Sequence, residues 1–101
     1  MSTLTLALNG EYFDAIRDGT KREEYRLVND YWKKRLVGRR YTEIVLTRGY
    51  PRADDDSRRL RLPWLGYRIL TITHKHFGNQ PVEVFAIDVT GKPISAGDVF
   101  S

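Results

Sequence analysis

The chain has 101 residues, with 17 Lys and Arg against 13 Asp and Glu, no cysteine, and a formal net charge of +4. This length predicts a single domain over residues 1–101, and the lack of cysteine excludes disulfides and thiolate metal sites. There is no run of 18 apolar residues and no basic segment followed by an apolar one at the N-terminus, so we expect a cytoplasmic protein without a membrane span or signal peptide.

The first elements are a strand and a short helix. Residues 3–9 alternate leucine with threonine and alanine, which predicts a half-buried strand. Asn9 is a good N-cap for a helix over residues 10–18, and Gly19 is a suitable helix stop.

A second strand and helix follow, and then a third strand. Residues 22–27 predict a strand with Glu24 and Arg26 on one face, because side chains two apart share a side. Residues 29–36 predict a helix that begins with cap residues. Residues 42–50 are rich in β-formers and predict a strand that ends in a Gly-Tyr-Pro turn.

The second half is predicted to be mainly β. Residues 52–58 are almost entirely polar and predict an exposed loop. A β-ribbon is expected over residues 59–62 and 64–77, with a bulge near Gly66.

The last predicted strand is 82–89, with a second bulge at residues 84–85, and residues 90–101 are expected to form a loop. Five or so strands with two short helices do not alternate as a doubly wound fold does. The expected fold class is therefore α+β, mainly β: a small curled sheet or barrel of about five to six strands with two short helices packed on it.

The stretch from residue 17 to 27 is dense in charge, and its pattern resembles a known family. Gly19, Lys21, Glu24 and Arg26 match the G-x-K-x-x-E-x-R pattern of the ASCH domains. The order of predicted elements is also similar to that family along the whole chain. The resemblance implies a small PUA-like β-barrel associated with RNA.

The same residues can be considered without the family. Gly19 can adopt φ > 0 and turn the chain into the strand, which places Lys21 at the strand's beginning. If the Glu24 face lines a cleft, a carboxylate lies between the cations Lys21 and Arg26, an arrangement that suits an anionic or amide-bearing ligand. The alternative is an ordinary exposed strand with paired charges.

RNA or nucleotide binding is the first function that the resemblance implies, with ribonuclease activity as a further expectation. Cleavage of RNA needs a base for the 2′-hydroxyl, an acid for the leaving oxygen and a cation for the phosphorane. Glu24 is the candidate base, and Lys21 or Tyr50 the candidate acid. Arg26 or Arg52 is the candidate phosphate clamp.

The alternative enzyme is an amidohydrolase that deacylates N4-acetylcytidine, an activity of some ASCH proteins. The family's lysine matches Lys21, but the residue three positions later is Glu24 where those enzymes have a threonine nucleophile. Thr20 adjoins Lys21 and is a candidate substrate contact, although its activation by Lys21 needs a different geometry. A second alternative is a non-catalytic interaction module.

Further basic residues are candidate RNA contacts. Arg48 and Arg52 flank Tyr50, an aromatic suited to stacking on a base, although Tyr50 is equally suited to capping the core. Arg59 and Arg61 share one face of a predicted strand that suits a phosphate backbone.

His74 and His76 are predicted to lie on one face of a strand, where they suit a metal pair or an acid–base pair. No third ligand is indicated, so an ordinary surface strand is favoured, and we expect no metal and no cofactor. Trp32 is assigned to the core or its edge. The expected partner is RNA or a modified nucleoside; the oligomeric state is open, with a monomer favoured.

Overall fold

The structure is a computed structural model that describes residues 2–94, and its fold is α+β and mainly β. The elements are, in order, β1 (Thr3–Leu8), α1 (Gly10–Arg17), β2 (Glu23–Leu27), α2 (Asp30–Leu36), β3 (Glu43–Arg48), η1 (Asp56–Arg58), β4 (Arg59–Pro63), β5 (Tyr67–Ile72), η2 (Lys75–Phe77) and β6 (Val82–Asp88). The predicted residues 95–101 of the terminal loop lie outside the described residues.

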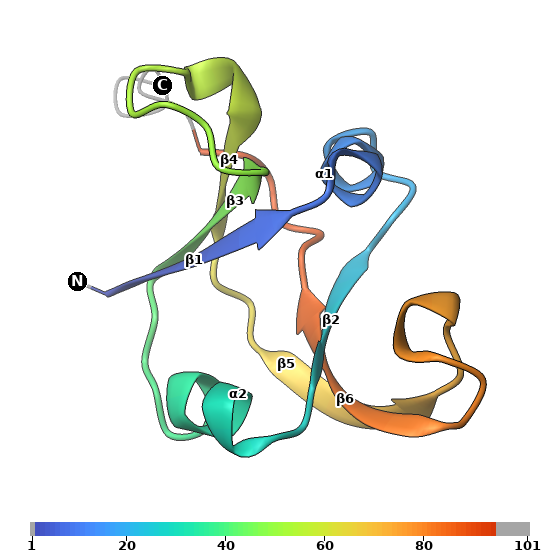
Figure 1. Cartoon of the computed structure of the whole chain (residues 1–101). Coiled ribbons are helices and arrows are strands. Elements are labelled where there is room, and N and C mark those ends of the chain that lie inside the picture. Colours follow the sequence, from blue (N-terminus) through green and yellow to red (C-terminus); the bar gives the residue numbers. More distant parts are fainter. Residues whose placement is uncertain (1, 95–101) are drawn as a thin grey trace.

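The strands pair into two three-stranded sheets (Figure 1). The first has the order β1-β3-β4, with β1 parallel to β3 and β3 antiparallel to β4. The second has the order β2-β6-β5 and is antiparallel throughout. Among residues 2–94 no strand pairing joins the two sheets, so no closed barrel is detected.

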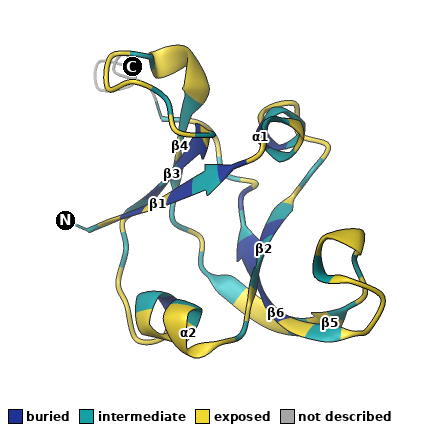
Figure 2. Cartoon of the chain, viewed as in Figure 1, coloured by how far each residue is buried: buried dark blue, intermediate teal, exposed yellow. Residues whose placement is uncertain are grey.

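One hydrophobic core lies between the two sheets and the two helices (Figure 2). Ile44, Leu46 and Phe85 are fully buried and belong to the central strands β3 and β6. Phe13 and Leu36 bring the two helices into the same cluster. The alternation predicted for residues 3–9 is confirmed, because the leucines of β1 face this core.

Both helices begin and end as predicted, to within one residue. The Oδ1 atoms of Asn9 and Asn29 each accept a hydrogen bond of 2.9 Å from the amide three residues on. Gly19 has φ 86° and Gly38 has φ 72°, a conformation that glycine adopts without steric cost. Neither these helices nor any other described one has the length and apolar character needed to span a bilayer.

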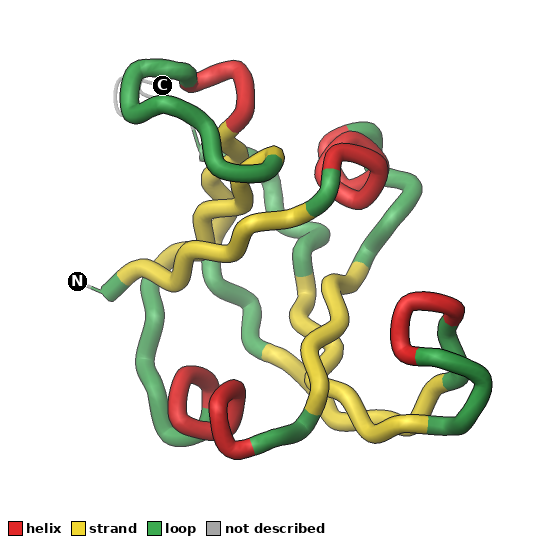
Figure 3. The backbone as a smooth tube through the Cα atoms, in the orientation of Figure 1, coloured by secondary structure: helices red, strands yellow, loops and turns green. Residues whose placement is uncertain are grey.

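The ribbon predicted over residues 64–77 is wrong in part. β4 ends at Pro63, and Gly66, with φ 87°, lies where the chain leaves the first sheet for the second. β5 covers residues 67–72 only, and residues 73–77 form a turn with the short helix η2 (Figure 3). The irregular pattern near Gly66 therefore marks a change of sheet and not a bulge.

The bulge predicted at residues 84–85 is also wrong. β6 keeps a regular register against both β2 and β5 from Val84 onward. Residues 84–87 are all buried, because β6 is the central strand of its sheet and is covered on both faces. A strand buried on both faces has no alternation to preserve.

Asp88, the last residue of β6, makes the fold sensitive to acid. Thr90 donates to the Asp88 carboxylate from its amide at 2.9 Å and from its hydroxyl at 2.6 Å. These hydrogen bonds lower the pKa of Asp88, with a smaller contribution from the charge of Arg22. The stabilisation is therefore complete above the ordinary aspartate pKa of about 4 and is lost as the pH falls through the lower folded-state pKa.

We expect Asp88→Asn to lower the free energy of unfolding by about 1 kcal/mol at pH 7. At pH 2.5, below the ordinary aspartate pKa of about 4, the difference from the parent should be smaller, since protonation of the carboxyl removes part of this stabilisation. Urea denaturation at the two pH values measures this. Equal losses at both would show that the charge of Asp88 contributes nothing.

Candidate functional site

A cavity of about 360 Å³ opens beside β2, where the end of β1, the start of α1 and residues 74–77 face that strand. Its aromatic side chains are Tyr12, Tyr25, Trp32 and Phe77. Its polar side chains are Asn9, Lys21, Glu24, Arg26, His74 and His76. Its volume is within the range of about 300–1,000 Å³ that is usual for small-molecule sites.

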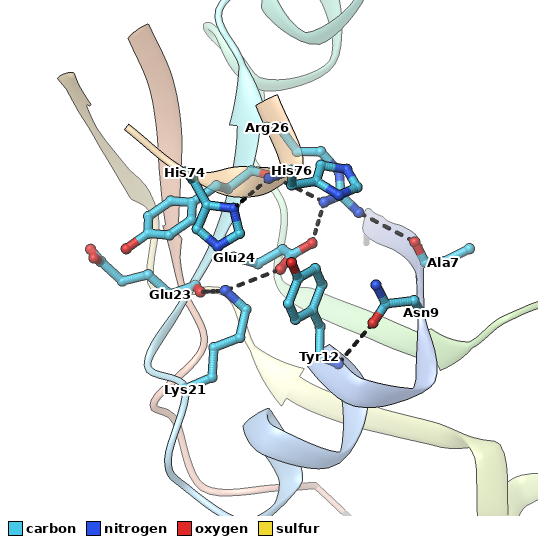
Figure 4. A network of polar contacts seen from close by, with 10 residues as sticks. Ala7, Asn9, Tyr12, Lys21, Glu23, Glu24, Arg26, His74 and His76 are labelled. Atoms are coloured by element: carbon cyan, nitrogen blue, oxygen red, sulfur yellow. Dashed lines mark hydrogen bonds and ion pairs between the residues drawn. The ribbon is translucent and has the colours of Figure 1, made fainter. Parts of the chain in front are cut away.

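Glu24 is at the centre of this site and is only 3% exposed. Lys21 Nζ lies 3.5 Å from its Oε1 atom, and Arg26 Nη1 donates to its Oε2 atom. Figure 4 shows the two cations approaching the carboxylate from opposite sides. The sequence suggested a carboxylate between two cations, and the structure contains this arrangement. The carboxylate is buried and does not extend into solvent.

The strand β2 explains why these side chains converge. Glu24 and Arg26 pair in register with Ile87 and Phe85 of β6, so all four side chains project from the same face of the sheet, the one toward the core. A carboxylate is costly on such a face unless each oxygen is paired. Both oxygens of Glu24 are paired, and no described buried side-chain polar atom lacks a partner.

Lys21 is held by several contacts besides Glu24. Its Nζ atom donates to the carbonyl of Glu23 at 2.6 Å, and it lies 5.2 Å from the ring centroid of Tyr12 and 4.7 Å from that of Tyr25. Burial raises the pKa of the Tyr25 phenol, and the charge of the neighbouring Glu23 adds to the rise. Tyr25 is therefore a neutral phenol beside a cation, which favours cation–π attraction.

Arg26, like Lys21, is held by several contacts. Its guanidinium also donates to the carbonyls of Tyr25 at 3.0 Å and Ala7 at 3.3 Å, and its Cζ atom lies 5.2 Å from the ring of Trp32. Trp32 was assigned to the core or its edge. It is partly buried against the core and also lines the cavity.

The two histidines were placed wrongly on a strand. The chain turns after β5, so that His74 caps the helix η2 and His76 lies within it, and both line the cavity. Each imidazole lies 6.2 Å from the Tyr12 ring, centroid to centroid, and Figure 4 shows both beside the Lys21–Glu24–Arg26 cluster. A histidine pair followed by Phe-Gly-Asn signals a turn, but nothing local shows what that turn faces.

The hydrogen bonds of the cavity wall define which groups remain for a ligand. His74 Nδ1 accepts the amide of His76 at 3.0 Å, so the proton of a neutral His74 is on Nε2. Asn9 Oδ1 caps α1, which leaves the two donors of its side-chain nitrogen without a partner among the described hydrogen bonds. The cavity is thus rich in donors and contains one carboxylate. Among the described residues no three His, Cys, Asp or Glu side chains are grouped to hold a metal ion.

Several predicted site residues do not reach this cavity. Tyr50 is 96% exposed, because the turn at Gly49 (φ 69°) carries it away from the core, and it cannot be the acid that serves Glu24. Arg48 pairs with Asp14 at 3.2 Å against the start of α1. Arg52 pairs with Asp54 at 3.6 Å.

Thr20 and Arg61, the other two predicted site residues, also make their contacts outside the cavity. The Thr20 hydroxyl donates to the Ala15 carbonyl at 3.1 Å at the end of α1, and this residue does not line the cavity. Arg61 pairs with Glu43 across β3 and β4 at 2.9 Å. Lys21, Glu24 and Arg26 are thus the predicted site residues that the structure brings together.

No family model, no curated protein and no solved structure matches the chain. The chemistry of this cavity is therefore the basis on which a function can be proposed.

Proposed function

We propose that the protein binds RNA or a nucleotide by taking one base into the cavity beside β2, which we call the base cavity. The observation that carries this proposal is a buried carboxylate held between Lys21 and Arg26 in the wall of an aromatic-lined cavity of about 360 Å³. Proteins that read single-stranded RNA stack unpaired bases on aromatic rings and form hydrogen bonds to the base edges. The cavity offers both kinds of contact.

The polar groups favour a base with both an amino group and acceptors. Each oxygen of an ionised carboxylate accepts two hydrogen bonds, so Glu24 keeps capacity for a ligand donor such as the N4 amino group of cytosine. The free donors of Asn9 and the Nε2–H of His74 suit the acceptors on the same base edge. The order of affinity expected among the four nucleotides therefore begins with cytidine.

The ASCH-type, PUA-like architecture is part of the same proposal. Two small sheets with two short helices are compatible with it, and of the motif residues Gly19 turns the chain while Lys21, Glu24 and Arg26 converge on the base cavity. A closed barrel would require hydrogen bonds between the edge strands of the two sheets.

The test is titration of the protein with the four nucleoside 5′-monophosphates. Binding is monitored by the fluorescence of Trp32 in a Trp64→Phe background. We expect cytidine monophosphate to quench the Trp32 fluorescence. Its affinity should be about tenfold weaker in Lys21→Met, because the nucleotide loses a charged hydrogen-bond donor. Lys75→Ala is the matched control, since Lys75 is exposed between the two histidines and does not line the cavity. Absence of binding to any nucleotide or RNA would leave the non-catalytic interaction module.

RNA cleavage is a second candidate, favoured by the two imidazoles that line the cavity with Lys21. In the step proposed, His76 accepts the 2′-hydroxyl proton while the 2′-oxygen forms a bond to phosphorus. His74, protonated on both ring nitrogens at the start of the step, donates its Nε2 proton to the 5′-oxygen as the P–O5′ bond breaks, and Lys21 offsets the charge of the phosphorane. The products are a 2′,3′-cyclic phosphate and a 5′-hydroxyl. Histidines replace Glu24 as the base here, because both Glu24 oxygens face cations.

We expect cleavage of single-stranded RNA to fall by at least 100-fold in His74→Asn, because general acid–base catalysis contributes roughly 10²–10⁴-fold. Asparagine can keep the cap of η2 through its side-chain oxygen, so this variant removes the imidazole with little effect on the fold. Electrophoresis of end-labelled RNA measures the rate. Equal rates in the parent and in the variant would leave binding without cleavage.

Deacylation of N4-acetylcytidine remains the alternative enzyme activity. Among the described residues that line the cavity there is no serine, threonine or cysteine, so an attacking water would have to replace the nucleophile of that mechanism. Incubation with N4-acetylcytidine distinguishes this activity from RNA cleavage. The reaction is measured as a change in the absorbance of the nucleoside.

A further inference from the structure

Residues 33–40, which directly follow Trp32 in the sequence, carry an unusual number of positive charges. Five cations occur within eight positions, and we call them the basic segment: Lys33, Lys34, Arg35, Arg39 and Arg40. Three lie in the last turn of α2 and two lie beyond Gly38. All but Arg35 are exposed, and Figure 2 shows the outer surface of α2 as largely exposed.

None of these five cations has an acidic partner among the described residues. The ion pairs there use other cations: Arg17, Lys21, Arg26, Arg48, Arg52, Arg58, Arg61 and Arg68. Cations near a helix C-terminus gain a little from the helix dipole, which accounts in part for residues 33–35. That gain fades beyond the last turn, so it does not account for Arg39 and Arg40.

The same helix borders a second depression next to the base cavity. This depression measures about 460 Å³ and lies between β1, α2 and the turn after β3. Ala7, Arg26 and Trp32 line both hollows, so the two are adjacent. Two uncovered aromatics, Tyr31 at 54% and Tyr50 at 96% exposure, border it.

Tyr31 is prepared for stacking. The Cζ atom of Arg35 lies 3.4 Å from the centroid of its ring, and Arg35 Nη1 donates to the Tyr31 carbonyl at 3.1 Å. An arginine packed on one face of an aromatic ring leaves the other face for a base. Binding sites for single-stranded nucleic acid combine such aromatic platforms with a line of cations.

We infer that the second depression and the basic segment together bind the nucleotides that flank the base held in the base cavity. The ligand is then single-stranded RNA of several nucleotides, and not a free nucleoside or a mononucleotide. The neighbouring base stacks on Tyr31 in the second depression. The following phosphates lie along the basic segment, where their charge is complementary to the unpaired cations. This inference rests on the proposed function and names its ligand class.

The experiment compares cytidine monophosphate with a labelled hexanucleotide RNA across a range of salt concentrations, by fluorescence quenching and anisotropy. We expect the hexanucleotide to bind at least tenfold more tightly in 100 mM salt, because base stacking and phosphate contacts are added. In Lys33→Ala/Lys34→Ala the log–log salt slope should become shallower by about 1.4, or about 0.7 for each lost contact. Tyr31→Ala should weaken hexanucleotide binding about tenfold.

Cytidine monophosphate should bind these variants as it binds the parent, since the substituted side chains do not line the base cavity. Lys75→Ala/Lys92→Ala is the control, because it removes two other exposed cations that have no acidic partner among the described residues. This control should leave the salt slope unchanged.

Three results would overturn the inference: equal affinity for the mononucleotide and the hexanucleotide, an unchanged slope in Lys33→Ala/Lys34→Ala, or equally tight binding of duplex RNA or anionic vesicles. Each of them is compatible with mononucleotide binding that depends on Lys21, so the proposed function would survive. Failure of the mononucleotide to bind, together with tight hexanucleotide binding that does not depend on Lys21, would instead remove the base cavity from the proposed function.

Discussion

Replacement of Glu24 by glutamine is expected to lower the free energy of unfolding by about 3 kcal/mol, because breaking a buried ion pair leaves an uncompensated charge in the interior. Glu24 is 3% exposed, and the side chains of its partners Lys21 and Arg26 are only 17% and 18% exposed. Glutamine keeps the shape of the side chain, but it turns an amide NH₂ toward one of the two cations. Urea denaturation with a fixed m-value measures the loss.

The matched control is Glu83→Gln, an exposed glutamate on β6 that has no ion pair among the described residues. It should change the free energy of unfolding by less than about 0.5 kcal/mol. Adding Lys21→Met to Glu24→Gln should recover part of the loss, since one unpaired cation is removed. A loss below about 1 kcal/mol in Glu24→Gln would show that water screens the cluster as it screens a surface pair.

Truncation of Phe85 to alanine is expected to cost about 4 kcal/mol of stability, because a fully buried ring is lost from the central strand of the second sheet. Its ring packs edge-on against Tyr67 at 5.0 Å. Phe85 also pairs in register with Arg26, so the substitution loosens the strand that carries the Glu24 cluster. We therefore expect weaker nucleotide binding even under conditions in which the variant is folded.

Ile69→Ala is the control for Phe85→Ala. Ile69 is the register partner of Phe85 on β5, but its side chain is 52% exposed. A half-exposed side chain has less buried area to lose, so the cost should stay below about 1 kcal/mol. Similar losses at the two positions, measured by urea denaturation, would contradict the placement of the core on the β6 side of this pair.

Much of the local structure could be predicted from the sequence. Periodicity located β1, β2 and β3, and the two asparagine caps located both helices, because each of these features depends on residues within one or two turns. The expectation failed where a strand is buried on both faces. The run in β6 has no alternation, and the chain's change of sheet at Gly66 resembled a bulge.

The candidate site, like the fold, was predicted only in part. The spacing of Glu24 and Arg26 places both on one face of β2, and Gly19 brings Lys21 to the beginning of that strand, so these three residues could be grouped in advance. Tyr50 was grouped with them wrongly. Its orientation depends on how the turn after β3 sits relative to the core, and spacing along the chain does not determine this.

The sequence by itself therefore determined the short-range features: the secondary structure of the first half, the helix caps, and the shared face of Glu24 and Arg26 with Lys21 just before their strand. Only the tertiary structure decided that this face is buried, that Trp32 forms one wall of the cavity, and that His74 and His76 line it as well. The histidines lie about fifty residues from Lys21 along the chain and reach the cavity through the pairing of β2 with β6 and of β6 with β5. The reason is physical: contacts between distant segments depend on which strands pair and which surfaces the core buries, and these are properties of the whole chain.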